Sequence, residues 1–408
     1  MFYTYKIGIS AEEHDSFVKQ SPQANLLQSS QWATVKSEWR NERLGFFKDG
    51  KLVAVASLLI RRLVVPFGFT MIYIPRGPVM DYEDAELVSF VFKSIEEFAL
   101  RERSVVIKFD PFIRLSSKTI TGDREEELNV LAVKDRIVDL GGIWSGRVQT
   151  MSATIQPTCH AVLYSESFSE ESLNKRVRQN IRSARNKGIE IRIGREELLR
   201  DFSELLKKTE ERKSIRLRGR EYYQKILNAY PENSYIVVAY LDLAERYEQL
   251  SYLEEKLVKE AMTFTSTTRQ SKIENYKKET RRINTELEMI NSLIRNGSKL
   301  VPLAGTLTID FAGTSENIYA GMDEKFKHYQ PALLTWVETA KYAFERGVKW
   351  QNLGGIEPTL DGGLYHFKSH LNPVVEEYIG GFDLIVSPIL HKIFQVLLEI
   401  RKKLRKKK

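Results

Sequence analysis

The sequence predicts a mixed α/β protein of two units, with a pair of long helices inserted in the second unit. In residues 52–109, short apolar segments alternate with a segment of helical periodicity. The same alternation returns in residues 173–311. Within that second unit, residues 244–296 contain almost no glycine or proline and repeat apolar residues in steps of three and four. Alternating strand and helix signals are typical of α/β folds.

The first unit is predicted from its apolar segments and their boundaries. Residues 52–60 (LVAVASLLI) are short, apolar and preceded by an Asp-Gly turn, which indicates a buried strand. A second short apolar run, 71–74, stops at Pro75. Residues 83–100 have apolar side chains at helical spacing, and residues 104–109 form another strand that ends at Asp110.

The second unit begins with a strongly basic helix and contains the long insertion. We expect helices and strands over the following residues: helix 173–187, strand 189–193, helices 202–209 and 222–229, and strands 234–241 and 300–311. Residues 243–296 indicate an antiparallel two-helix coiled coil inserted between two of these strands. A further helix starts at Pro331, and strand 350–355 (WQNLGG) leads into a glycine loop.

Composition limits the compartment and the partners. The 408 residues include 62 Lys and Arg against 54 Asp and Glu, which gives a net charge of +8 and favours an anionic partner, either nucleic acid or an acidic membrane surface. The single cysteine, Cys159, excludes a disulfide framework and fits a reducing cytoplasm. We expect neither a secretory signal nor a membrane-spanning segment.

Residues 384–408 form an amphipathic segment with a basic end, RKKLRKKK. One helical stripe would carry Val386, Ile389, Ile393, Leu397, Ile400 and Leu404. An in-plane helix on anionic lipid and a helix docked on the core with a solvated tail both fit this pattern.

Several catalytic motifs are absent. The sequence has no GxxxxGK[ST], no GxGxxG after a strand, no HExxH, no paired CxxC and no GxSxG. We therefore expect no metal, no bound cofactor and no hydrolysis of ATP.

Three short segments could carry chemistry. Lys36 lies four residues after Trp32 and could hold a phosphate, although it also fits a surface lysine. Asp110 ends a strand and could be a general base, although Asp-Pro also starts turns. Arg218 and Tyr222 could clasp a phosphate by charge and hydroxyl, with a solvated basic face as the alternative.

Two basic stripes suit a nucleic-acid backbone. The first is on the helix KRVRQNIRSARNK and includes Lys175, Arg176 and Arg182. The second lies off the apolar seam of the coiled coil and includes Lys277, Lys278, Arg281 and Arg282. Interleaved glutamates make a salt-bridged solvated face an equal alternative for the second stripe.

Together these segments resemble the Fem-type (FemABX) aminoacyltransferase family, and within it the MurM/MurN branch. The residues that carry the resemblance span nearly the whole chain: SSQWATVK, YIPRGP, KFDP, KRVRQNIRSARNKG, LRGREYY, IYAG, WQNLGG and LYHFK. The resemblance implies two acetyltransferase-like (GNAT-like) subdomains with a helical arm in the second. The first would comprise residues 1–153 and 380–408, the second 154–379, and the arm 243–296.

The resemblance also implies an activity and roles for individual residues. The enzyme would add Ala or Ser from alanyl- or seryl-tRNA to the stem-peptide lysine of lipid II or of its nucleotide-linked precursor. Lys36 and Arg218 would bind the diphosphate of the precursor, and Tyr222 and Tyr319 would line its site. Asp110 would lie near the accepting amine. Lys368, beside Phe367, would lie at the aminoacyl end of the tRNA.

The implied reaction needs neither ATP nor a metal, because an aminoacyl ester is already activated. It therefore agrees with the absence of ATP-binding and metal-binding motifs. A lysine amine has an ordinary pKa of about 10.4, so a group must accept its proton. Asp110 and the terminal ribose hydroxyl of the tRNA both qualify. We assign Lys368 to the stabilisation of the oxyanion.

Other functions and the cellular location also follow from the sequence as expectations. The alternatives are an acyl-CoA-dependent GNAT N-acyltransferase, for which no Q/RxxGxG/A loop is present, and a non-catalytic protein that binds tRNA or membrane. We expect a cytoplasmic location, peripheral on the inner face of the plasma membrane through the C-terminal helix.

Overall fold

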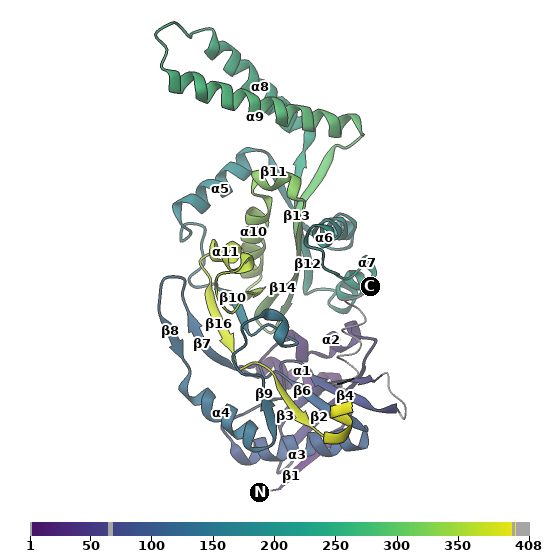
Figure 1. The fold of residues 1–408 in the computed structure, drawn as a ribbon. Helices are drawn as coiled ribbons and strands as arrows, with labels where there is room; N and C mark the ends of the chain where they lie inside the picture. The colour runs from purple at the N-terminus through teal and green to yellow at the C-terminus, as the bar shows by residue number, and fades with distance from the viewer. Residues whose placement is uncertain (1, 64–67, 394–395, 397–408) are drawn as a thin grey trace.

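The computed structural model describes residues 2–63, 68–393 and 396 of the chain. Two large mixed sheets, each covered by helices, lie one after the other, and a helical arm projects from the second (Figure 1). The long apolar segments of the sequence become the central strands, because strands buried on both faces need uninterrupted apolar side chains.

The first sheet is built mainly from the N-terminal part of the chain. Its strands, in spatial order, are β1 (Tyr3–Ile7), β2 (Arg40–Lys48), β3 (Lys51–Arg62), β4 (Thr70–Ile74), β6 (Ser104–Phe109), β17 (Phe382–Ile385) and β9 (Gly142–Trp144), with β5 (Val79–Met80) paired to β3. Only β4 and β6 run parallel among these pairs. The helices of this part are α1 (Ala11–Gln20), α2 (Ser30–Val35), α3 (Ala85–Arg101) and α4 (Leu128–Asp139).

The second sheet holds most of the elements that bear on the candidate site. Its strands, in spatial order, are β11 (Ile189–Gly194), β12 (Ser234–Asp242), β13 (Leu300–Phe311), β14 (Thr314–Met322), β15 (Trp350–Gly355), β10 (Cys159–Tyr164), β16 (Val374–Tyr378), β7 (Arg114–Lys118) and β8 (Arg124–Glu126). Its helices are α5 (Lys175–Asn186), α6 (Leu199–Lys213), α7 (Arg220–Ala229), α10 (Pro331–Glu345) and α11 (Gly363–Ser369).

The two halves exchange strands. Strand β17, from the end of the chain, lies between β6 and β9 of the first sheet, whereas β7 pairs with β16, and β8 with β7, at the edge of the second. The exchange ties both sheets together, because each contains strands from distant parts of the chain. The subdomain boundaries given above stay a prediction.

The arm consists of α8 (Leu243–Ala261) and α9 (Gln270–Arg295), which lie side by side between β12 and β13 (Figure 1). Near the sheet, the apolar stripes of the two helices are buried, and Leu250, Ile283 and Ile290 belong to one core cluster. Further out, Leu253 and Leu257 are only partly buried. Tertiary packing at the base is therefore expected to hold the arm in place.

The structure corrects the start of the C-terminal helix. Leu384 and Ile385, assigned above to the amphipathic segment, belong to strand β17, where Leu384 is buried in the first core. The helix begins at Pro388 and is described to residue 393. Leu397, Ile400, Leu404 and the basic tail lie outside the described residues. Among the helices that the structure describes, none is long and apolar enough to cross a membrane.

Candidate functional site

Lys368 lies on the short helix α11, whose start is fixed by Glu357. The carboxylate of Glu357 accepts hydrogen bonds from the backbone N–H groups of Leu364, at 3.2 Å, and Tyr365, at 2.9 Å. A Cβ at Gly362 would lie 2.1 Å from the Glu357 carboxyl carbon, so only glycine allows this approach. Gly362, the residue before α11, therefore lets Glu357 hold the start of the helix that carries Lys368.

The side chain of Lys368 is buried, with only 5% of its surface exposed. Its Nζ donates a hydrogen bond of 2.8 Å to the backbone oxygen of Gly355 and lies 5.6 Å from the centre of the Trp336 ring. Burial lowers the pKa of Lys368 to about 7, against the opposing effect of Glu357. Its charge therefore changes near neutral pH.

Four predicted residues from distant segments meet in one cluster, named here the precursor cluster: Lys36, Arg218, Tyr222 and Tyr319. Lys36, which caps α2, donates a hydrogen bond of 2.6 Å to the hydroxyl of Tyr222 and lies 4.6 Å from the Trp32 ring centre. The Arg218 guanidinium lies 5.0 Å from the Tyr222 ring centre, and Tyr319 contacts Tyr222 edge to face.

The precursor cluster is suited to bind an anion. Burial and the charge of Arg218 lower the pKa of Lys36 to about 8. Two cations are thus held close together, and the opposing charge of Glu38 does not restore the pKa of Lys36, so an added anion would stabilise the pair. The tyrosine hydroxyls supply further donors.

Gly354 lies between Lys368 and strand β14, the strand that carries Tyr319 of the precursor cluster. This glycine has φ +90°, and a Cβ there would lie 3.3 Å from the Nζ of Lys368 and 3.7 Å from the backbone oxygen of Asn317. Asn317 lies on β14, two residues before Tyr319. The charge of Lys213, the last residue of α6, also lowers the pKa of Lys368.

Asp110 is buried at the end of β6, apart from Lys368. It accepts hydrogen bonds from the hydroxyl of Tyr73, at 2.8 Å, and from the backbone N–H of Arg76, at 2.7 Å. Burial raises its pKa. In the described residues Asp110 and Lys368 have no hydrogen-bond partner in common, so its role as general base stays a prediction.

A buried polar chain connects the Asp110 region to Gly354, and the sequence did not indicate it. The Arg76 guanidinium lies 2.9 Å from Nε2 of His160, whose Nδ1 lies 3.1 Å from the Asn352 side-chain oxygen. That oxygen also accepts the N–H of Gly354, at 2.7 Å. Burial and the charge of Arg76 lower the pKa of His160 to about 3, so the ring is neutral. The chain fixes the backbone beside Lys368.

Most of the predicted RNA-binding residues lie on two neighbouring surfaces. All the predicted arm residues line one pocket of about 660 Å³: Lys277, Lys278, Arg281 and Arg282. Arg182 of α5 and Arg282 of α9 line a second pocket of about 470 Å³ between α5 and the arm. Lys175 and Arg176 are exposed near the start of α5 and line neither pocket.

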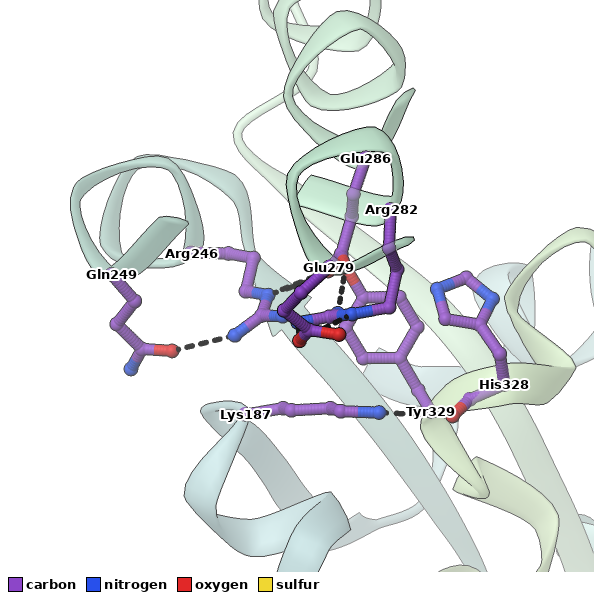
Figure 2. A network of polar contacts seen from close by, with 8 residues as sticks. All are labelled: Lys187, Arg246, Gln249, Glu279, Arg282, Glu286, His328 and Tyr329. Carbon is purple, nitrogen blue, oxygen red and sulfur yellow. Dashed lines mark hydrogen bonds and ion pairs between the residues drawn. The ribbon is translucent and has the colours of Figure 1, made fainter. Parts of the chain in front are cut away.

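Figure 2 shows the polar contacts at the base of the arm. Arg246 of α8 and Glu286 of α9 form an ion pair of 2.6 Å, with both side chains 4% exposed. The Tyr329 hydroxyl donates to Glu286, and Arg282 pairs with the same carboxylate at 3.0 Å. Lys187 donates to the backbone oxygen of His328, at 3.0 Å. The predicted RNA-binding residue Arg282 is therefore also part of the arm's support.

Sequence and structure comparisons agree over nearly the whole chain. A model of the FemAB family matches residues 9–399. A protein of Staphylococcus aureus strain MRSA252, named Lipid II:glycine glycyltransferase, is 27% identical over 99% of this chain and 97% of its own length. A crystal structure of FemX superposes with a TM-score of 0.74 at 25% identity, covering 96% of this chain and 99% of that one.

A further structure bears on the fold alone. A tandem GNAT protein from the clavulanic acid biosynthesis pathway superposes with a TM-score of 0.50 at 8% identity, covering 94% of this chain and 99% of that one. The predicted α/β fold of two GNAT-like subdomains is thereby confirmed.

Proposed function

This chain belongs to the FemAB family, and we propose that it is a tRNA-dependent aminoacyltransferase acting on the stem-peptide lysine of the peptidoglycan precursor lipid II. The predicted Fem-type family is confirmed, and the MurM/MurN branch stays a prediction. The observation that carries the proposal is a buried lysine, Lys368, that approaches Gly354 next to strand β14, the strand that also brings Tyr319 into a cluster of two cations and two tyrosines. Such a site can hold a diphosphate and act on a nearby acyl group.

The precursor cluster binds the acceptor in this proposal. Lys36 and Arg218 take the diphosphate, because charge-assisted hydrogen bonds to phosphate are the strongest contacts that these side chains make. Tyr222 and Tyr319 line the sugar-phosphate end, and the stem peptide extends toward Lys368. The same contacts would accept the nucleotide-linked precursor, which also carries a diphosphate.

The reaction needs one bond to form and one to break. The neutral acceptor amine attacks the ester carbonyl carbon, and the C–O bond to the tRNA ribose breaks after a tetrahedral oxyanion has formed. The amine proton passes to the ribose oxygen that leaves, either directly or through Asp110, which first accepts it and then gives it up. Protonated Lys368 stabilises the oxyanion where water is excluded, and Phe367 and Trp336 form the apolar surroundings.

The donor is proposed to bind along the basic residues of α5 and the arm. The negative backbone of tRNA suits the exposed cations that line the two pockets, with Lys175 and Arg176 continuing the surface. Alanyl- or seryl-tRNA is the proposed donor, although the staphylococcal relatives are named for glycine. The proposed location is the inner face of the plasma membrane, where lipid II is made available.

The activity assay compares three charged tRNAs and three acceptors. The protein is incubated with alanyl-, seryl- or glycyl-tRNA carrying labelled amino acid, together with lipid II, singly branched lipid II or the nucleotide-linked precursor. We expect label to appear on the precursor with alanyl- or seryl-tRNA. No transfer from any tRNA to any acceptor would reject the proposal, and transfer from acyl-CoA instead would favour the N-acyltransferase alternative.

Lys36→Met is expected to raise the KM for the acceptor by roughly 10- to 100-fold, because a charged hydrogen bond contributes about 1.5–3 kcal/mol. The kcat should change little, since Lys36 lies away from the reacting carbonyl. The matched control is Lys225→Met: Lys225 is exposed on α7, with its Nζ 3.3 Å from the Ser37 hydroxyl, outside the precursor cluster. Equal KM values for the two variants would contradict the assignment.

A further inference from the structure

One end of the first sheet carries arginine side chains that the proposed chemistry does not use. Residue Arg62 at the end of β3 pairs with Thr70 at the start of β4, which pairs with Ser104 at the start of β6. Four exposed arginines gather at this end: Arg40, Arg61, Arg62 and Arg103. Arg40 is paired with Glu42 and Glu102, so the positive charge comes chiefly from the other three.

Aromatic rings lie beneath two of these arginines. The Arg61 guanidinium lies 5.4 Å from the Trp39 ring centre, and the Arg103 guanidinium lies 5.3 Å from the ring centre of Phe69. Trp39 and Phe69 are both partly exposed. Trp rings are enriched at the headgroup level of bilayers, and Trp and Phe both occur on apolar faces that lie in this interface next to cationic side chains.

The C-terminal helix starts at the same end of the sheet. The backbone N–H groups of Val386 and Ser387 both bond to the oxygen of Val105, one residue after the start of β6 (Figure 1). The helix then exposes two isoleucines one turn apart, Ile389 at 76% and Ile393 at 51%. Lys392, between them in sequence, is also exposed. These side chains are not docked on the core.

We propose that this end of the first sheet, formed by Trp39, Arg61, Arg62, Phe69, Arg103 and helix 388–393, is the face by which the protein lies on an anionic lipid bilayer. The arginines neutralise lipid phosphates, each contributing to adsorption, and the isoleucines enter the boundary of the acyl chains. This membrane face extends the contact beyond the C-terminal helix to the strands of the first subdomain.

The membrane face lies next to Lys36, the residue proposed to bind the diphosphate of the acceptor. This part of the inference rests on the proposed function. The N–H of Trp39 bonds to the backbone oxygen of Lys36, at 2.8 Å. The residue assigned to the diphosphate is thus three positions from a ring on the membrane face. A lipid-linked diphosphate that enters from the bilayer would meet Lys36 directly behind the membrane face, while its lipid chain stays in the membrane.

Vesicle binding tests the proposal with the full-length protein. Vesicles of phosphatidylglycerol with phosphatidylcholine are compared with vesicles of phosphatidylcholine alone by co-sedimentation. Arg61→Gln/Arg62→Gln should weaken binding to the anionic vesicles by roughly 30-fold, since each arginine near the surface contributes about fivefold. Arg200→Gln/Lys207→Gln, on the exposed side of α6, removes the same charge elsewhere and should leave binding close to wild type.

A second variant tests the apolar contribution, and a truncation separates the tail. Ile389→Ser/Ile393→Ser should also weaken binding to anionic vesicles. Deletion of residues 401–408 should weaken it further in both variants. Three results would overturn the proposal. The first is that Arg61→Gln/Arg62→Gln binds anionic vesicles as well as the wild type does, and the second is that the wild type binds neutral and anionic vesicles equally. The third is that the double variant loses tRNA binding and keeps vesicle binding.

The acceptor used in the assay separates this proposal from the proposed function. Arg61→Gln/Arg62→Gln should transfer to the soluble nucleotide-linked acceptor at the wild-type rate and lose rate only with lipid II in anionic vesicles. If the wild-type protein transfers to neither acceptor, the proposed function fails, and vesicle binding still decides the membrane face.

Discussion

Lys368→Met lowers kcat by roughly 10²- to 10³-fold, the size of effect seen when one oxyanion donor is removed. Methionine replaces the apolar stem of the side chain but offers no charge to the tetrahedral oxyanion. We expect the protein to stay folded, because the lysine is buried and removal of a buried cation relieves a desolvation cost. Single-turnover transfer from aminoacyl-tRNA measures the effect, with Lys207→Met as the exposed control.

The pH dependence gives a second measurement on the same residue. With a pKa of about 7, Lys368 is mostly charged below pH 7 and mostly neutral above it. The stabilisation of the oxyanion should therefore decline as the pH rises through 7, and this decline should be absent from the residual rate of Lys368→Met. Lys213→Met should move the decline to higher pH, because the charge of Lys213 lowers the pKa of Lys368.

Two outcomes would assign Lys368 another role. An increase in the KM for aminoacyl-tRNA with unchanged kcat would mean that Lys368 only holds the tRNA end. A wild-type rate that rises through pH 7, lost in the variant, would make the neutral lysine a general base. Wild-type turnover of Lys368→Met would remove it from the mechanism.

The local patterns of the sequence predict the elements well, because each depends on nearby residues. The apolar run 52–60 became β3, and the repeats in 243–296 became α8 and α9. Pairing between distant segments has no such signal. Strands β7 and β8 are short and polar, and nothing local indicates that they complete the second sheet.

In the candidate site, too, some residues were predicted from the sequence and others were not. Lys36, Arg218, Tyr222 and Tyr319 were predicted through the resemblance, and the structure brings them together. The chain through Arg76, His160 and Asn352 was missed, although YIPRGP and WQNLGG were both noted. Its members are one residue from each of three distant segments, so only tertiary contact reveals them.

Arg246 shows why a polar residue in an apolar repeat is hard to interpret. In the sequence it interrupts the apolar seam of the arm, which indicates a break in the packing. In the structure it is buried and paired with Glu286 of the facing helix. A buried ion pair of this kind can fix the register of two helices at some cost in stability.

Glu286→Leu is expected to lower the free energy of unfolding of the arm base by about 3–5 kcal/mol, because it leaves the buried Arg246 without its carboxylate partner. The Tyr329 hydroxyl and Arg282 would also lose their common acceptor. Hydrogen exchange along α8 and α9 measures the loss, and denaturant unfolding of the whole chain supports it. Glu279→Leu is the matched control, since Glu279 pairs with Arg282 but its side chain is 46% exposed.

The double variant Arg246→Met/Glu286→Leu distinguishes an unpaired charge from lost packing. If the unpaired charge causes the loss, the double variant should recover most of the stability, because apolar residues of similar volume often replace a buried ion pair without cost. If the double variant is as unstable as Glu286→Leu alone, the hydrogen bonds of Tyr329 and Arg282 carry the arm base instead. Either outcome shows which contacts of Glu286 stabilise the arm base.

The pH dependence and the activity of Glu286→Leu connect the arm to the donor. Burial raises the pKa of Glu286, but hydrogen bonds from Tyr329 and Arg246 outweigh it and hold that pKa below its ordinary value. The stability from Glu286 is thus present above about pH 4.3 and lost as the pH falls through the lowered value. At pH 7 the variant should raise the KM for aminoacyl-tRNA and leave the KM for the nucleotide-linked acceptor unchanged, because only the proposed tRNA surface rests on the arm. Equal changes in both KM values would mean that the arm supports the whole second subdomain and not the donor alone.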